Sequence, residues 1–181
     1  MLNRLATRRS APAQALTTPG PDGAQIADIL TLAARSPDHG KLFPWRFVVM
    51  GPTSRAAISE KLATMAIDKG LPQKARAVLA KLTAAPTTVL VISTAAPASK
   101  PVWEQELSAG AVCMNLEHAA SAFGFASSWI TDWYSYDADA TPLFGLRDGE
   151  KVAGFIHLGT AAEPLLERDR PDVAVLTTTL P

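Results

Sequence analysis

The chain has 181 residues, 48% of them hydrophobic and 19% charged, and its 17 basic residues balance 17 acidic ones. This composition excludes global disorder, and the zero formal charge gives no support for a broad nucleic-acid-binding surface. A single cysteine, Cys113, excludes an intramolecular disulfide and a CxxC redox pair. His39, His118 and His157 lack the i, i+4 spacing of a helical metal site, so we expect no metal. The length predicts one domain over 1–181, although length alone also allows two small ones.

The chain opens with a predicted helix that carries Arg8, Arg9 and Ser10. Two guanidinium groups beside a hydroxyl suit a phosphate group, because together they offer several charge-assisted hydrogen bonds. A mononucleotide cofactor is therefore the first hypothesis to test. Residues 1–21 contain no acidic residue and many Ala, Ser and Thr, a composition that also fits an organelle transit peptide.

Residues 22–35 form the first strongly patterned segment. Asp22 and Gln25 have the spacing of a capping box, and apolar residues recur behind them at intervals of three and four. This pattern predicts a helix that ends before Pro37, because proline disfavours helical angles in the residue that precedes it.

The next elements are bounded by glycine and proline. A strand is expected at 47–50, and Thr53 or Ser54 is expected to cap a helix that runs to about residue 69. Residues 73–83 are rich in Lys, Arg and Ala and predict a short polar helix or lid. The uncharged stretch 82–99 is interrupted by prolines and hydroxyl residues, so it predicts a buried strand rather than a membrane span.

The longest predicted helix spans residues 103–123, between Pro101 and Gly124. Beyond its first turn it has almost no polar face, and a helix that is apolar all round is buried all round. Small residues at 109–111 allow another backbone to come close. Such a helix belongs either to the centre of the core or to a subunit interface, and we favour an interface because a domain of ~180 residues has a limited core volume.

The rest of the chain predicts short strands and no common phosphate-binding loop. Strands are expected at 87–94, 127–130 and 152–160, followed by an extended tail at 161–181. Strands mixed irregularly with helices indicate an α+β layered fold. There is no GxGxxG after a strand, no GxxxxGKS/T and no GxSxG. With no signal peptide visible, we expect a cytoplasmic protein.

Five groups of short segments carry more information together than any one of them alone. They are Arg8-Arg9-Ser10; Arg35-Ser36-Pro37-Asp38-His39 with Pro44-Trp45; Trp103-Glu104-Gln105-Glu106 with Ser108-Ala109-Gly110; Gly124-Phe125; and Val152-Ala153-Gly154-Phe155-Ile156-His157-Leu158-Gly159. In this order and spacing, over nearly the whole chain, they resemble the FMN-dependent nitroreductase family, most closely its short bacterial members. The resemblance implies a nitroreductase-like α+β fold with a central mixed or antiparallel sheet flanked by helices.

The resemblance also implies an intertwined homodimer with two FMN molecules at the subunit interface. One subunit would hold the phosphate and the ribityl chain with Arg8, Arg9 and Ser10. The other subunit would bring Arg35 and His39 to the flavin. The whole chain would then be one FMN-binding domain.

Two further segments are implied by the same resemblance. Trp129, Ile130 and Thr131 would line the pocket of the first subunit. Close relatives carry Trp-Arg-Ser there, so Ile130 removes a cation. A stretch associated with the nicotinamide cofactor in the short members matches Ala119, Ala120, Ser121, Ala122, Phe123 and Gly124. No catalytic protein residue is implied, because the flavin supplies the chemistry.

The implied activity is that of an FMN-dependent oxidoreductase, which passes hydride from NADH or NADPH through flavin N5 to a small acceptor such as a nitro compound or a quinone. The missing cation at Ile130 leaves a second hypothesis, a non-catalytic FMN-binding sensor or storage module. A third hypothesis keeps the fold and changes the chemistry, as in dehalogenating or flavin-fragmenting relatives. Each arginine also has a plain alternative as a solvated charge or, for Arg35, as a cation at the end of its own helix.

Overall fold

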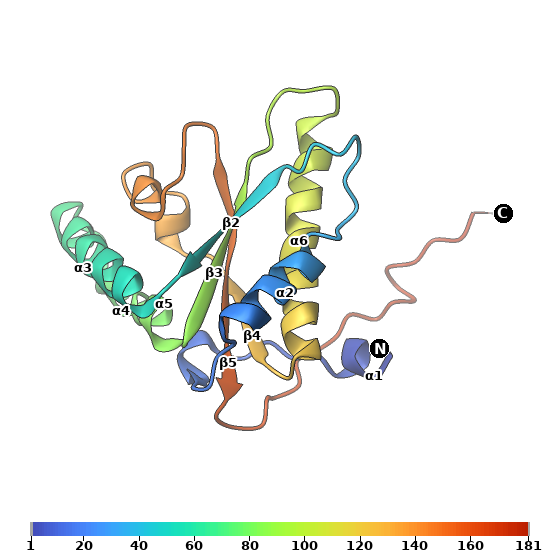
Figure 1. Cartoon of the computed structure of the whole chain (residues 1–181), viewed down its shortest axis with the longest axis horizontal. Coiled ribbons are helices and arrows are strands. Elements are labelled where there is room, and N and C mark those ends of the chain that lie inside the picture. The colour runs from blue at the N-terminus through green and yellow to red at the C-terminus, as the bar shows by residue number, and fades with distance from the viewer. Residues whose placement is uncertain (1, 181) are drawn as a thin grey trace.

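The computed structural model describes residues 2–180, in which an antiparallel sheet separates two layers of helices (Figure 1). The helices are α1 (Leu2–Thr7), α2 (Gly23–Ala33), α3 (Pro52–Asp68), α4 (Gln73–Ala77), α5 (Ala80–Ala84) and α6 (Val102–Ala122), with 3-10 turns η1 (Ala13–Ala15), η2 (Trp133–Ser135) and η3 (Thr141–Phe144). The strands are β1 (Leu16–Thr17), β2 (Trp45–Met50), β3 (Thr87–Ser93), β4 (Ala126–Ile130) and β5 (Lys151–Ala161).

The sheet has the order β1-β5-β3-β2, and β4 also pairs with β5. Every one of these pairings is antiparallel. The central sheet flanked by helices is therefore confirmed in its antiparallel form. The two-residue strand β1 and the 3-10 turns were not predicted, because such short elements leave no periodic pattern in the sequence.

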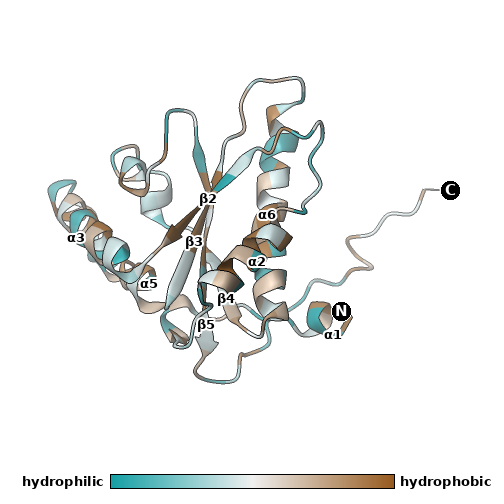
Figure 2. Cartoon of the chain, viewed as in Figure 1, coloured by the Kyte–Doolittle hydropathy of each residue, from teal (hydrophilic) through white to brown (hydrophobic). Residues whose placement is uncertain are grey.

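Strand β3 runs through the middle of the molecule, and its side chains divide between the two faces of the sheet. Val89 and Val91 join the apolar cluster under α2 and α6, whereas Leu90 and Ile92 join the cluster under α3 and α5. All four are fully buried. Burying a side chain of this size contributes about 1.5–3 kcal/mol, so these two clusters hold the three layers together. Figure 2 shows apolar residues gathered where β2, β3 and α2 meet.

The starts of α2 and α3 show one correct prediction and one wrong prediction. Gln25 N donates to Asp22 Oδ1 at 2.9 Å, and Asp22 N donates to Gln25 Oε1 at 3.0 Å, which confirms the capping box. Helix α3 begins instead at Pro52, so the expected cap at Thr53 or Ser54 is wrong. Proline is favoured at the first helical position because its missing N–H has no intrahelical acceptor there.

Within one chain, helix α6 is buried on one side only, so the core of a single chain does not cover it all round. Val112, Cys113 and Leu116 are fully buried against the sheet and α2, whereas Trp103 is 66% exposed and Leu107 is 54% exposed. Residues three and four apart lie on one face of a helix. The outward face, here called the α6 stripe, consists of Trp103, Leu107, Gly110, Met114, His118 and Ala122.

Two further predictions, a short helical segment at 73–83 and an extended tail, agree with the structure. Segment 73–83 folds as the two short helices α4 and α5, and residues 162–180 form no helix or strand, as expected of a tail. Within residues 2–180, no helix combines the length and the hydropathy that crossing a membrane requires.

Candidate functional site

The segment Arg8-Arg9-Ser10 lies in the loop after α1, not on the opening helix as predicted, because α1 ends one residue before it. The neighbouring Ala11 anchors this loop: it is 2% exposed, and its N–H donates to the Ser127 carbonyl of β4 at 2.9 Å. Within the loop, Arg8 Nη1 donates to Ser10 Oγ at 3.3 Å. The loop therefore holds two guanidinium groups and a hydroxyl beside β4.

A cleft of about 580 Å³, here called the arginine cleft, opens against this loop. Arg4, Arg8 and Arg9 line it together with Ser121 and Gly124 from the end of α6. Arg4 Nη1 also donates to the Ser121 carbonyl and so connects α1 with α6. The structure thus brings the predicted phosphate-binding arginines next to the stretch expected to contact nicotinamide.

Only part of the stretch 119–124 faces the arginine cleft. Ala119 and Ala120 are 6% and 0% exposed and pack in the core under α2, so they do not line the cleft. Ser121 and Gly124 do line it, and Gly124 has a φ of 90°, the left-handed conformation that ends α6. The other two residues are exposed: Ala122 and Phe123.

A second cleft, of about 360 Å³ and here called the tryptophan cleft, includes Ser10. Trp129 and Ile130 line it, which places them beside the Arg8–Ser10 loop as predicted. Lys81 and Arg168 line it too. Although Ile130 carries no charge, cations from α5 and from the tail therefore reach the same cleft.

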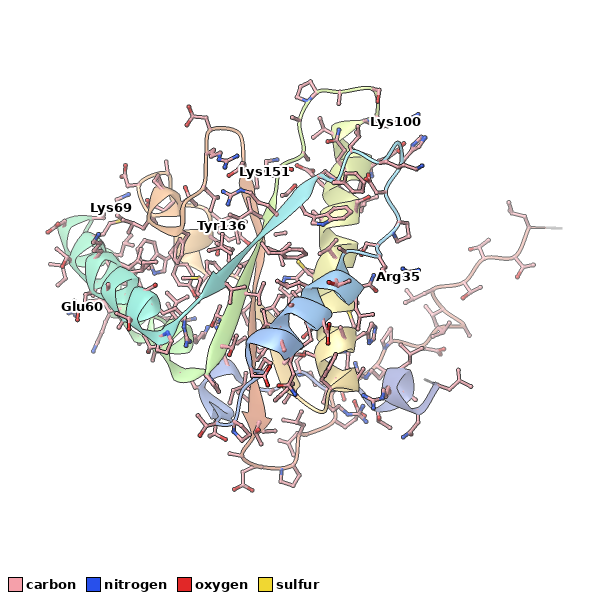
Figure 3. All side chains as sticks on the ribbon, in the orientation of Figure 1. Arg35, Glu60, Lys69, Lys100, Tyr136 and Lys151 are labelled. Carbon is pink, nitrogen blue, oxygen red and sulfur yellow. The ribbon has the colours of Figure 1, made fainter. Side chains whose placement is uncertain are left out.

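Trp129 is positioned by a close approach to β5. Its Nε1 donates to the Ala153 carbonyl at 3.1 Å. A Cβ atom on Gly154 would lie 2.0 Å from that same nitrogen, so only glycine leaves room for the indole. Thr131 lines neither cleft, and its Oγ1 accepts from the Tyr136 hydroxyl at 2.8 Å. Tyr136, labelled in Figure 3, lies on the segment after β4.

Arg35 and His39 lie apart from both clefts. Arg35 follows the end of α2 on the outer side of the molecule (Figure 3), and it is exposed. His39 Nδ1 lies 2.5 Å from Glu104 Oε2 at the start of α6. Neither residue lines the arginine cleft or the tryptophan cleft. A single chain therefore does not bring them to the Arg8–Ser10 loop.

Four charged residues that line the two clefts or pair with Arg9 were missed by the sequence analysis. Arg4 and Lys81 lie on helices that carry no recognisable motif. The other two belong to the tail, where the continuous charged run at 167–170 was the available signal. They are Glu167, whose carboxylate pairs with Arg9, and Arg168.

No cysteine nucleophile is available for chemistry at either cleft. Burial, and to a smaller extent the charge of Glu117, raise the pKa of Cys113 to about 12. The thiol therefore stays protonated at neutral pH, and only the thiolate is a nucleophile. What the clefts offer chemically is a set of cationic donors for an anion and, in the tryptophan cleft, the apolar surface of Trp129 and Ile130.

Comparisons with known proteins point to one family. The protein-family model described as "Nitroreductase family" matches residues 5–160 of this chain. A protein of Escherichia coli strain K12 named "Putative NAD(P)H nitroreductase YdjA" is 36% identical over 164 residues, covering 88% of this chain and 87% of that protein.

Solved structures share the fold at lower identity. A nitroreductase-like family protein from Bacillus cereus has a TM-score of 0.84 at 16% identity and covers 99% of this chain and 95% of its own. A nitroreductase with bound FMN from Bacteroides fragilis has a TM-score of 0.77 at 22% identity, with coverages of 99% and 98%. These likenesses confirm the nitroreductase-like fold.

Proposed function

The chain belongs to the nitroreductase family, and we propose that it is an FMN-dependent oxidoreductase that uses NADH or NADPH to reduce a small acceptor such as a nitro compound or a quinone. The observation that carries this proposal is the arginine cleft, where three guanidinium groups and the end of α6 surround one space. The nitroreductase from Bacteroides fragilis was crystallised with FMN, and the Escherichia coli relative is named for NAD(P)H. Both names support the choice of cofactor and electron donor.

The residues present fit the anionic end of FMN. A phosphate needs several directed donors, and Arg8 and Arg9 are accessible from the cleft while Ser10 holds a hydroxyl 3.3 Å from Arg8. Bound there, FMN supplies a ring whose N5 takes up hydride and passes it on. The protein residues bind and orient: the loop holds the phosphate, and Trp129 and Ile130 form a wall of the neighbouring tryptophan cleft.

We also propose that two copies of this single domain form the complete site. Within one chain Arg35 and His39 line neither cleft, so a second copy is needed to bring them to the cofactor. The α6 stripe is the surface proposed to meet that copy, because it is a largely apolar helix face on which Trp103, Leu107 and Ala122 are exposed while the other members are half-buried. Gly110 lies in its middle, and a Cβ atom there would meet nothing within 4 Å. This leaves space for a neighbouring backbone.

The absorbance spectrum of the purified protein tests the proposal. We expect a flavin spectrum, either as purified or after addition of FMN, and anaerobic bleaching on addition of NADH or NADPH. A colourless protein that takes up no FMN would falsify the proposal. Uptake of FMN without oxidation of either nicotinamide, across nitro and quinone acceptors, would instead favour a binding module without turnover.

A further inference from the structure

The tail folds back onto the loop that carries the phosphate-binding arginines. After β5, Leu165 packs against the buried cluster of Ala11, Leu16 and Ala85. Further along, Arg170 Nη2 lies 3.4 Å from the Arg8 carbonyl that accepts from it. The segment between these two contacts is therefore docked beside the arginine cleft.

Within this docked segment, the carboxylate of Glu167 is held as an anion in a phosphate site would be held. Its Oε1 accepts from Arg170 Nη2 at 2.8 Å, from Arg170 Nε at 3.1 Å and from the backbone N–H of Arg168 at 2.9 Å. Its Oε2 pairs with Arg9. Two guanidinium groups and a backbone N–H are the donor types that recognise phosphate.

Arg9 is shared between the tail and the cleft. It lines the arginine cleft while its Nη2 pairs with Glu167. The side chain of Glu167 is 52% exposed and that of Arg9 is 20% exposed. An ion pair this exposed is screened by water and weak, so the carboxylate can leave when a stronger anion arrives. A phosphate that carries up to two negative charges is such an anion.

We propose that Glu167 competes with the cofactor's phosphate for Arg9 and thereby sets how tightly the chain holds a phosphorylated flavin. This inference rests on the proposed function and adds a specificity-determining residue to the same site. Because Glu167 acts only on the phosphate, it lowers affinity for FMN and leaves affinity for riboflavin unchanged. Because FMN is held less tightly, the cofactor can exchange with free FMN.

The test compares Glu167→Gln with the matched control Asp169→Asn. Both variants remove one negative charge from the same exposed segment, but no ion pair of Asp169 occurs among the described residues. Dissociation constants for FMN and riboflavin are measured by flavin fluorescence quenching at low ionic strength. We expect Glu167→Gln to bind FMN about 2- to 5-fold more tightly, the range of an exposed ion pair. Riboflavin affinity and Asp169→Asn should stay within error of wild type.

Three results would overturn the proposal that Glu167 competes with the phosphate for Arg9. Weaker or unchanged FMN binding by Glu167→Gln would show that the carboxylate positions Arg9 or does nothing. An equal gain in Asp169→Asn would reduce the effect to net charge, and an equal gain with riboflavin would place it away from the phosphate. In an Arg9→Gln background the gain should disappear.

A second probe separates this inference from the proposed function. Inorganic phosphate should raise the thermal unfolding midpoint of Glu167→Gln more than that of wild type, and 0.5 M NaCl should remove the difference, since at ~0.5 M the Debye length is only about 4 Å. This measurement needs no flavin. If wild type binds no FMN, the proposed function fails, while the phosphate titration still decides whether Glu167 competes for Arg9.

Discussion

Arg55 and Arg8 show two opposite uses of the same side chain. Arg55 is 1% exposed, and its guanidinium donates to the Leu82 carbonyl at 2.9 Å and the Ala85 carbonyl at 2.6 Å. It also reaches the Pro86 carbonyl at 2.9 Å and the Thr88 hydroxyl at 3.2 Å. Arg8, by contrast, donates from its guanidinium to Ser10 alone among the described residues, at 3.3 Å.

The difference separates a structural cation from one that we propose to bind the cofactor. Burial lowers the pKa of Arg55, so the charge is costly there, and its guanidinium compensates by donating to carbonyls at and just after the end of α5. Arg8 lines a cleft, and Ser10 is the one acceptor of its guanidinium among the described residues. Removing Arg55 should therefore damage the fold, and removing Arg8 should damage binding.

Arg55→Met is expected to have the largest effect on stability. It leaves several buried carbonyls without a donor, and each such loss costs about 1–3 kcal/mol, so we expect a total near 3–5 kcal/mol. Urea unfolding of the protein without FMN measures it. Arg8→Met is the matched control and should change the free energy of unfolding by less than about 1 kcal/mol. Equal losses in the two variants would remove the distinction.

Acid should destabilise the same buried region through His157. Burial, followed by the charges of Arg55 and Lys81, lowers the pKa of His157 from 6.5 to about 4. Between those two pH values His157 is protonated in the unfolded state but stays neutral in the folded state. The free energy of unfolding therefore falls as the pH drops through this window. The full loss is about 3 kcal/mol.

Comparing urea unfolding of wild type and His157→Gln at pH 7 and pH 4.5 isolates this contribution. His157 Nδ1 lies 2.9 Å from Thr88 Oγ1, and glutamine retains a polar group for that contact. The variant should lose less stability on acidification than wild type. Identical pH slopes would mean that other groups, such as carboxylates, cause the acid sensitivity.

Arg8→Ala combined with Ser10→Ala tests the binding side of the comparison. We expect the FMN dissociation constant to rise about 10- to 100-fold, because a charge-assisted contact and a hydroxyl donor are lost from the phosphate. Apo-protein stability, measured with FMN removed, should fall by less than about 1 kcal/mol. A stability loss as large as the binding loss would make these residues structural.

Gly110→Leu should have the smallest effect on the stability of the single chain, but it should strongly weaken association of two chains. A Cβ atom at Gly110 meets nothing within 4 Å, so the fold should tolerate the side chain. If a second copy packs there, the molar mass measured by light scattering should fall and bound FMN should be lost. An unchanged mass and an unchanged flavin content would contradict the placement of the interface on the α6 stripe.

Much of the fold was predictable because its signals are local. The Asp22–Gln25 capping box, the apolar run of β3 and the small residues of α6 are each read within a few positions of the chain. The candidate site was predictable only in part. The loop Arg8–Ser10 does meet Trp129, Ile130 and Gly124, whereas Ala119 and Ala120 face the core instead. The cofactor-binding roles of all these residues stay predictions.

The sequence by itself determined the layered α+β class, the positions of the long elements and the membership of a family, because periodicity and motif order are properties of the chain. Only the tertiary structure decided which charges meet. Glu167 reaches Arg9, Lys81 and Arg168 reach the cleft beside Ile130, and Arg55 is buried under α5. These contacts join residues far apart in sequence, and their partners are set by how the sheet and helices pack, which no local pattern records.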